Sequence, residues 1–296
     1  MSYYNLQKPT ITVVMPTYNA GNYLRSAVLS VVFQSFKDWE LLLIDDGSTD
    51  NSIASISNIK DKRIKIIKEK KNIGIIKIMN KAIKVARGIF LARMDADDIC
   101  HPKRFAKQVE FLKNNSHIDL VATDCIVISE NDKILGRLSF SSNYINLISR
   151  PWLSIDMPHP TWLGKTSWFR HHGYSKSFFL DKKMIEDQEL LLRSHETSQF
   201  YVMPYYLFAY RTKNQINLKK IFSKHFFLFV VHIKYFFKKK KYFNLILSTF
   251  RFLLGCLITI LEKLKLSPIK FTKIKDDMSS EDLIYWKSWV NELKKK

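Results

Sequence analysis

Three clusters of polar side chains follow apolar runs of the sequence, and a further pair of acids lies later in the chain. They are Pro16-Thr17-Tyr18-Asn19, Asp45-Asp46, Asp95 to Asp98, and Glu186-Asp187. Two carboxylates spaced as Asp95 and Asp97 suit a hard divalent cation, which takes oxygen ligands and lets a diphosphate complete its shell. Taken singly, each cluster is also explained by ordinary turn or helix-capping chemistry.

The elements before these clusters must bring them together. Short β-branched or apolar runs predict buried strands at residues 11–15, where Pro16 ends the run, and at 41–44, 64–67 and 89–92. Helical periodicity follows from Tyr23 to near Ser35 and over 75–86, with a further helix expected beyond Asp50. This alternation predicts an α/β fold with a Rossmann-like, mostly parallel sheet flanked by helices. Ligands of such sheets gather at the carboxyl ends of the strands, where clustered acids repel one another unless a cation joins them.

Composition divides the chain into two unlike parts. The 296 residues are 46% hydrophobic, enough for one or two globular domains, and carry a net charge of +21. Residues 213–296 hold +13 of that charge, so we expect a catalytic domain at 1–212 and a basic helical extension at 213–296. The charge predicts a polyanionic partner: nucleic acid, an anionic membrane or phosphorylated small molecules. Three scattered cysteines imply neither disulfides nor zinc, and without a secretory signal at the N-terminus a cytoplasmic protein is expected.

The order of the motifs resembles that of a family 2 glycosyltransferase with the GT-A fold. The resemblance runs from about Ile11 to Arg211 and is specific for the family, though not for a sugar. The matching stretches are Val14-Met-Pro-Thr-Tyr-Asn19, Trp39-Glu-Leu-Leu-Leu-Ile-Asp-Asp-Gly-Ser-Thr-Asp50, Asn72-Ile-Gly74 with Asn80, Arg87-Gly-Ile-Phe-Leu91, Met94-Asp-Ala-Asp-Asp98 before His101-Pro102, and Glu186-Asp187 with Leu192-Arg193.

The resemblance implies a nucleotide-sugar pocket and a metal. Thr17, with Tyr18 beside it, matches the nucleoside contact, Asp46 matches the residue that hydrogen-bonds the base, and Asp45 supports the turn. Asp97 matches the acid that holds Mn²⁺ or Mg²⁺ on the diphosphate, and Asp95 the acid near the ribose and the metal. The positions expected to bind the nucleotide sugar are Pro16, Thr17, Tyr18, Asp46, Asp95 and Ala96.

The resemblance also implies an acceptor side. Asp187 matches the family's general base, and direct attack opposite the leaving group inverts the anomeric centre; capping of a helix that begins at Glu186 is the structural alternative. Contacts to the acceptor or the diphosphate are expected from His159, Glu186 and Trp162. His159 could equally fill a loop, and Trp162 or Trp168 could stack on a sugar or lie in the core.

One departure from the family pattern concerns a cation. Many members carry a basic residue where this chain has Met79, so Lys77 or Arg93 is expected to serve the diphosphate instead.

The basic extension leaves three possibilities open. Phe222, Phe226, Phe229, Val230, Ile233 and Phe237 share one side of a predicted helix, Lys238 to Lys241 follow, and residues 243–261 are mostly apolar around Arg251. The segment could lie on an anionic inner leaflet, span the membrane, or pack on the catalytic domain or in a homodimer. Residues from Ser279 onward predict one short capped helix.

These expectations combine into one function. The leading hypothesis is an inverting glycosyltransferase that moves a sugar from a nucleotide diphosphate sugar, expected to be a UDP-sugar, to a hydroxyl of a glycan or lipid-linked acceptor in cell-surface polysaccharide synthesis. The enzyme would work peripherally at the cytoplasmic face of the cell membrane. One alternative is a sugar-nucleotide pyrophosphorylase, but the sequence after the first strand has no Gly-rich loop with a following Arg. A second alternative is a basic nucleic-acid-binding protein, but the sequence contains no recognisable nucleic-acid-reading module, so no nucleic-acid partner is expected.

Overall fold

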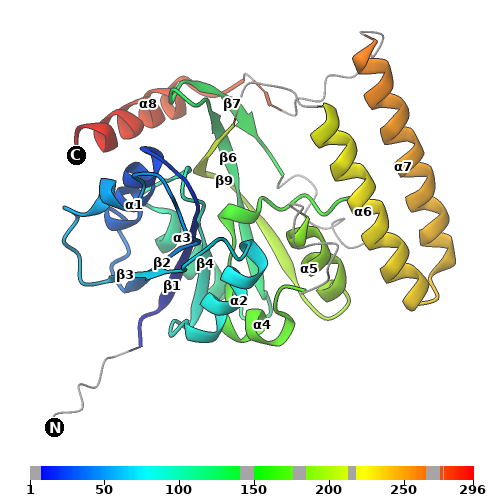
Figure 1. Cartoon of the computed structure of the whole chain (residues 1–296), viewed down its shortest axis with the longest axis horizontal. Helices are drawn as coiled ribbons and strands as arrows, with labels where there is room; N and C mark the ends of the chain where they lie inside the picture. The colour runs from blue at the N-terminus through cyan, green and yellow to red at the C-terminus, as the bar shows by residue number, and fades with distance from the viewer. Residues whose placement is uncertain (1–7, 141–149, 176–184, 213–217, 265–273, 276) are drawn as a thin grey trace.

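The computed structural model describes residues 8–140, 150–175, 185–212, 218–264, 274–275 and 277–296. Within these residues nine strands form a single sheet in the order β3-β2-β1-β4-β8-β6-β9-β5, with β7 paired to β6 (Figure 1). The strands are β1 (Ile11–Thr17), β2 (Trp39–Asp45), β3 (Ile64–Lys68), β4 (Phe90–Arg93), β5 (Ile99–Cys100), β6 (Leu120–Ile128), β7 (Ile134–Leu138), β8 (Leu163–Lys165) and β9 (Phe200–Arg211).

The N-terminal half of the sheet is wholly parallel, as the alternating pattern predicts. β1 pairs in parallel with both β2 and β4, and β2 pairs in parallel with β3. The second half is mixed, because β8 runs antiparallel to β4 and β6 whereas β9 runs parallel to β6. The carboxyl ends of β1, β2 and β4 therefore meet at one edge of the sheet, which places the polar clusters together.

Helices cover both faces of the sheet and continue beyond it. They are α1 (Tyr23–Val32), α2 (Ile75–Val85), α3 (Arg104–Asn114), α4 (Thr166–His172), α5 (Glu186–Ser194), α6 (Leu218–Lys238), α7 (Tyr242–Lys263) and α8 (Ser280–Lys295), with 3₁₀ turns η1 (Ala54–Ile56) and η3 (His159–Thr161). Adjacent residues of β1 divide between the two faces: Val14 packs in the cluster formed with α2, α4 and α5, and Val13 in the cluster formed with α1 and α3.

Two expectations for the N-terminal half are wrong in detail. β1 does not end at Pro16 but continues to Thr17, and Pro16 pairs with Ile44 of β2. The ladder between β1 and β4 ends at Val14, so Pro16 lies beyond it and its missing N–H costs no bond to β4. The helix expected beyond Asp50 is only the 3₁₀ turn Ala54–Ile56.

Gly88 allows the chain entering β4 to pass close to β1. An added Cβ would lie 2.3 Å from the backbone nitrogen of Thr12 and 2.7 Å from the carbonyl carbon of Ile11. These backbone atoms cannot move aside without disturbing the sheet. We therefore expect Gly88→Ala to lower the free energy of unfolding by about 2–4 kcal/mol, measured by urea denaturation.

Gly21→Ala is the matched control for that substitution. Gly21 has a φ of +57°, but no atom lies within 4 Å of its ideal Cβ position. The substitution therefore introduces backbone strain without a clash, and about 1–2 kcal/mol is expected. Equal destabilisation by both variants would contradict the proposed role of the close approach at Gly88.

The C-terminal part does not form one separate extension. α6 and α7 lie side by side as a hairpin against α5 at one end of the molecule, whereas α8 lies next to β7 and α1 at the other end (Figure 1). α8 buries Trp286, Trp289 and Val290 in a cluster with strand residues, and the indole Nε1 of Trp289 donates to the carbonyl oxygen of Cys100 at 2.9 Å. Within the predicted extension over 213–296, α8 therefore packs on the catalytic core. Its predicted N-cap is confirmed, since Ser279 Oγ accepts from the Asp282 N–H.

Candidate active site

The centre of the site is the segment that follows β4. Asp95 is partly exposed, with 31% of its side chain accessible, and its Oδ1 lies 2.5 Å from a guanidinium nitrogen of Arg93. Arg93 is buried and also donates to the carbonyl oxygen of Met94 at 2.5 Å. Its two terminal nitrogens are therefore both engaged, and one of them holds the Asp95 carboxylate at the opening of the site.

Asp97 and Asp98 extend this acidic cluster. Asp97 is exposed, and its pKa is raised because surrounding protein desolvates the carboxylate and because Asp95 is negatively charged. Asp98 is buried, and its pKa is raised well above the usual range by burial and by the charges of Asp97 and Asp95. Its Oδ1 accepts from the Arg211 N–H at 2.7 Å, whereas Oδ2 has no hydrogen-bond partner within the described part of the chain. The cluster is thus short of positive charge.

A divalent cation fits this shortage. Among the described residues, no three His, Cys, Asp or Glu side chains converge as a complete metal site. Asp95 and Asp97 would therefore supply only part of an oxygen shell, and the oxygens of a diphosphate would complete it. The mutual repulsion of the acids would be relieved by such a cation.

The ends of β1 and β2 form the neighbouring edge of the site. Thr17 is buried and pairs in register with Asp45, while Tyr18 is 51% exposed and Pro16 is partly buried. Asp45 Oδ1 accepts from the Ser48 N–H at 2.9 Å, which confirms that Asp45 supports the turn. Ala96 lies between the two exposed acids and is itself buried.

Asp46 is already engaged by the protein backbone. Its two carboxylate oxygens accept from the N–H groups of Ile73 and Gly74, at 2.7 and 3.0 Å, just before α2. Gly47 makes this approach possible, because a Cβ there would lie 2.7 Å from the carbonyl carbon of Lys71. Each carboxylate oxygen has a second lone pair, so the base contact expected for Asp46 stays a prediction.

The second pair of acids begins α5, as predicted. Glu186 is buried, and burial together with the charge of Asp187 raises its pKa to about 7. Burial also raises the pKa of Asp187, while the charge of Lys224 on α6 lowers it. Asp187 Oδ1 accepts from the Gln188 N–H at 2.8 Å, and Glu186 Oε2 has no hydrogen-bond partner among the described residues. Glu186 is therefore suited to exchange a proton near neutral pH.

A buried His–Tyr pair lies between the two groups of acids. His159 Nε2 and the Tyr174 hydroxyl are 2.7 Å apart, and His159 Nδ1 is 3.9 Å from Glu186 Oε1. Burial, and to a smaller extent the charge of Arg93, hold the pKa of His159 well below its usual range, so the imidazole is neutral. Asn80 fixes Tyr174 by bonding both its backbone N–H and its carbonyl oxygen.

Tyr174 shows that the donor-side and acceptor-side acids share one site. Burial raises its pKa, the charge of Arg93 lowers it, and the charges of Glu186, Asp187 and Asp95 raise it. All four charges therefore act on one phenol. Residues that are far apart in the sequence converge as their order along the chain predicted.

Two candidate side chains do not line the site. Trp162 is completely buried, its Nε1 donates to the Met157 carbonyl oxygen at 3.3 Å, and its ring meets the His159 ring edge-on at 4.6 Å. Trp168 is buried beside Ser198. Stacking on a sugar is therefore wrong for both indoles in this structure. Of the two candidate cations, Lys77 is exposed on α2, whereas Arg93 lies in the site.

Arg211 and Tyr174 are site residues that the sequence reasoning missed. Arg211, at the end of β9, donates from Nε to the carbonyl oxygen of Asp97 at 2.6 Å and from Nη1 to that of Ser129 at 2.8 Å. It thereby positions the loop that carries the acids. No local pattern identifies it, because these two carbonyl oxygens lie 114 and 82 residues earlier in the chain.

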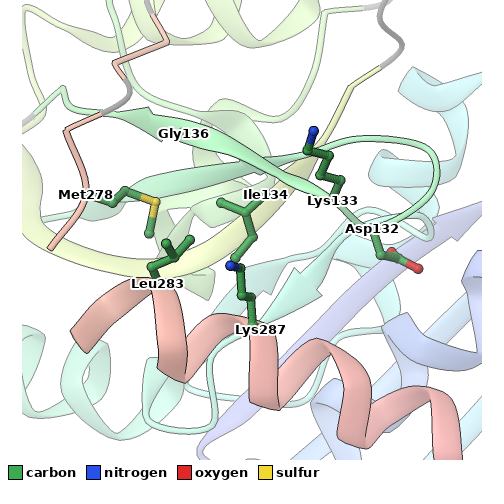
Figure 2. A pocket seen from close by; sticks show the side chains of 7 residues that line it. All are labelled: Asp132, Lys133, Ile134, Gly136, Met278, Leu283 and Lys287. Atoms are coloured by element: carbon green, nitrogen blue, oxygen red, sulfur yellow. The ribbon is translucent and has the colours of Figure 1, made fainter. Parts of the chain in front are cut away.

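A separate pocket does not coincide with the acids. Its volume is about 360 Å³, and Figure 2 shows Ile134 of β7 facing Leu283 of α8 and Met278 across it. Asp132 at its rim pairs with Arg211 and Lys294, and both ion pairs are structural. None of the residues lining this pocket is a predicted site residue.

Comparisons with known proteins agree with this geometry. Residues 12–173 match the model of the glycosyl transferase family 2. An uncharacterized glycosyltransferase of Methanocaldococcus jannaschii is 30% identical over 246 residues, covering 80% of this chain and 83% of the relative. The UDP-Glc:alpha-D-GlcNAc-diphosphoundecaprenol beta-1,3-glucosyltransferase of Escherichia coli is 36% identical over 128 residues, covering 43% of this chain and 49% of the relative.

A solved structure has the same fold. The mannosyltransferase PcManGT from Pyrobaculum calidifontis, in complex with GDP-Man and Mn²⁺, superposes with a TM-score of 0.60 over 97% of this chain and 86% of its own, at 14% identity. The match confirms the predicted arrangement of a GT-A sheet with flanking helices. On the extent of the family match and the length of the archaeal relative covered, this chain belongs to the glycosyl transferase family 2 and is a nucleotide-sugar glycosyltransferase with the GT-A fold.

Proposed function

We propose that the chain is an inverting, metal-assisted glycosyltransferase that moves a sugar from a UDP-sugar to a hydroxyl of a glycan or lipid-linked acceptor in cell-surface polysaccharide synthesis. The observation that carries the proposal is the convergence of Asp95, Glu186 and Asp187 around Tyr174, which His159 links to Glu186, while Arg93 pairs with Asp95. The E. coli relative is named for a UDP-Glc donor and a diphosphoundecaprenol-linked acceptor, which supports both choices. The structural neighbour's Mn²⁺ supports the cation.

The donor side must stabilise the negative charge that develops on the leaving group. As the glycosidic bond breaks, the nucleoside diphosphate gains negative charge; Asp97 and Asp95 would hold Mn²⁺ or Mg²⁺, which stabilises that charge when bound. Arg93 holds the Asp95 carboxylate in place through their ion pair. Thr17, Tyr18 and Asp46 line the neighbouring edge, where the nucleoside would bind.

The acceptor side must remove a proton. An acceptor hydroxyl is very weakly acidic and needs a base as it attacks the anomeric carbon. Asp187 takes that proton, and attack from its side, opposite the leaving group, inverts the anomeric centre. Glu186 and the His159–Tyr174 pair surround the base with buried polar groups.

A donor panel tests this function. The full chain is incubated with UDP- and GDP-sugars, Mn²⁺ or Mg²⁺, and glycan or lipid diphosphate acceptors, while nucleotide diphosphate release and the anomeric configuration of the product are measured. We expect UDP release with a UDP-sugar and an inverted product. Release only from GDP-sugars would overturn the donor choice, and a retained configuration would overturn the role of Asp187.

Glu186→Gln is expected to shift the acidic limb of the pH profile of kcat/KM to lower pH. Asp187 works as a base only when ionised, so activity is complete above its pKa and is lost as pH falls through it. Burial raises the pKa of both Glu186 and Asp187, and each negative charge disfavours the other. Removing the Glu186 charge therefore lowers the pKa of Asp187. A limb that stays in place would contradict this interaction.

A further inference from the structure

The outer face of α7 carries a continuous row of exposed large apolar side chains. They recur every three or four residues, and each is between 51% and 71% exposed: Phe243, Ile246, Phe250, Leu253, Leu257 and Ile260. The segment Tyr242–Leu261 has a mean hydropathy of 1.9, and among the described helices it alone has the length and composition to cross a membrane. Only 11% of its most apolar window is buried.

The inner face of α7 has the opposite chemistry. Ser248, Gly255 and Thr259 are buried against the protein, and a Cβ at Gly255 would lie 3.1 Å from the His225 ring on α6. A helix on the surface of a water-soluble protein turns its apolar side inward and its polar side to solvent. α7 does the reverse, so its outer face is suited to an apolar environment.

α6 extends the same surface. Phe229 of α6 stacks on Phe252 of α7 at 4.6 Å, and Phe226 and Phe237 of α6 are 43% and 65% exposed. The predicted apolar side of α6 is thus confirmed, and most of it faces outward. His232 of the same helix is buried against the protein. The two helices together present one apolar surface.

The positive charge of the hairpin favours an anionic bilayer over a second copy of the chain as the partner of this surface. Residues 218–263 contain a single acid, Glu262, and ten Lys or Arg, and Lys238 and Lys240 at the turn are exposed. A symmetric dimer through this surface would bring the same cations together with only one acid per chain to neutralise them. An anionic bilayer supplies both a negative surface and an apolar interior.

The hairpin lies along the catalytic domain and does not project from it. At its turn, Lys239 and Lys241 both pair with Glu196, at 2.7 and 2.6 Å, and α6 packs on α5. The chain enters from Arg211 in β9 and returns at Lys275, which bridges to Arg137 in β7. A spanning helix would have to leave these contacts.

We propose that the α6–α7 hairpin is a docking surface for an anionic bilayer, with the outer face of α7 inserted among the headgroups and the first acyl carbons. α5 lies directly under α6 and carries Asp187, whose pKa is affected by Lys224 of α6. Docking through this hairpin therefore places the acceptor side of the site beside the lipid. It would hold the enzyme at the inner face of the cell membrane.

Vesicle flotation of the full chain tests the docking surface without any catalytic readout. Vesicles of phosphatidylcholine alone are compared with vesicles that also contain phosphatidylglycerol, at low and high salt. We expect flotation with the anionic vesicles that weakens at high salt. The double variant Phe250→Ser/Leu253→Ser should lose at least about tenfold in partitioning, since two large apolar side chains no longer enter the lipid.

Two further variants separate the apolar and electrostatic contributions. Lys238→Gln/Lys240→Gln should lower partitioning about tenfold or more on anionic vesicles and leave it unchanged on neutral ones. Ile89→Ser is the matched control, because Ile89 is an apolar side chain 62% exposed on the catalytic domain, outside the hairpin. It should float like the wild type.

Several results would overturn the proposal. Flotation of Phe250→Ser/Leu253→Ser equal to that of the wild type would remove the apolar surface as the docking site. Absence of wild-type flotation, with a dimer in sedimentation velocity that this variant converts to monomer, would assign the surface to a second copy. Resistance of the membrane-bound protein to carbonate extraction would assign it to a spanning helix.

Discussion

Replacement of Asp187 with asparagine is expected to lower turnover by about 10²–10⁴-fold, the usual contribution of a positioned general base. Asparagine keeps the shape and the hydrogen bonds at the start of α5 but cannot take a proton from an acceptor hydroxyl. The loss should appear in kcat rather than in the KM for the donor, because the edge proposed to bind the donor is formed by β1, β2 and β4 and not by α5. Steady-state release of nucleotide diphosphate measures both constants.

The alternative role of Asp187, capping of α5, predicts a different result. Acids in the first turn of a helix are stabilising, so a capping residue should lower the melting temperature when it is neutralised. Burial raises the pKa of Asp187, which means that its charge is held at a cost in the folded protein. We therefore expect Asp187→Asn to melt at the wild-type temperature or above it, as catalytic residues often do.

Glu189→Gln is the matched control on the same helix. Glu189 pairs with Arg193 at 2.8 Å, one turn along α5, and neutralising it removes the same charge. It should retain turnover close to that of the wild type. Loss of activity in Glu189→Gln equal to that in Asp187→Asn would indicate that the acidity of the helix, not one base, is responsible.

Most of the parallel half of the sheet could be predicted because β1, β2 and β4 are short and buried, and because helical periodicity separates β1 from β2 and β3 from β4. Pro16 was misleading for a physical reason: proline usually ends a strand because it lacks an N–H. Here the neighbouring strand β4 no longer pairs at that position, so no N–H is needed. Strand length thus depended on a register that no local pattern encodes.

Charge was a poor guide to the C-terminal boundary. The net positive charge of residues 213–296 grouped α8 with α6 and α7, yet α8 buries Trp286, Trp289 and Val290 against strands from the first half of the chain. Its charged face is simply solvated. A tryptophan pair at helical spacing in an otherwise polar helix was the available signal for this packing.

The acids of the site could be predicted because they follow strands whose carboxyl ends must meet. The groups that control them could not. Arg211 reaches the Asp97 carbonyl oxygen only because β9 pairs with β6, and Tyr174 meets His159 only because Asn80 fixes the chain after α4. Such contacts join segments up to 114 residues apart, so they depend on tertiary structure rather than on spacing.

The second large effect is expected at Asp97. Asp97→Ala should lower turnover by about 10²–10³-fold, the size of the loss when one group that stabilises developing charge is removed. The side chain is exposed at the opening of the site, so no core packing is lost and the melting temperature should not fall. Desolvation by the surrounding protein and the charge of Asp95 raise the pKa of Asp97. Removing the Asp97 carboxylate therefore also relieves its repulsion with Asp95.

Metal dependence distinguishes this role from a general loss of acidity. The wild type should lose activity in EDTA and recover it with Mn²⁺ or Mg²⁺, whereas Asp97→Ala should need a higher Mn²⁺ concentration for half-maximal activity, because one oxygen ligand is missing. The control is Glu292→Ala on α8. Glu292 is half exposed and pairs only with Lys296 among the contacts described, so this variant should need the same Mn²⁺ concentration as the wild type. An Asp97→Ala enzyme with wild-type turnover and an unchanged Mn²⁺ requirement would show that Asp97 holds no metal, and the donor diphosphate would then have to be stabilised by cations such as Arg93.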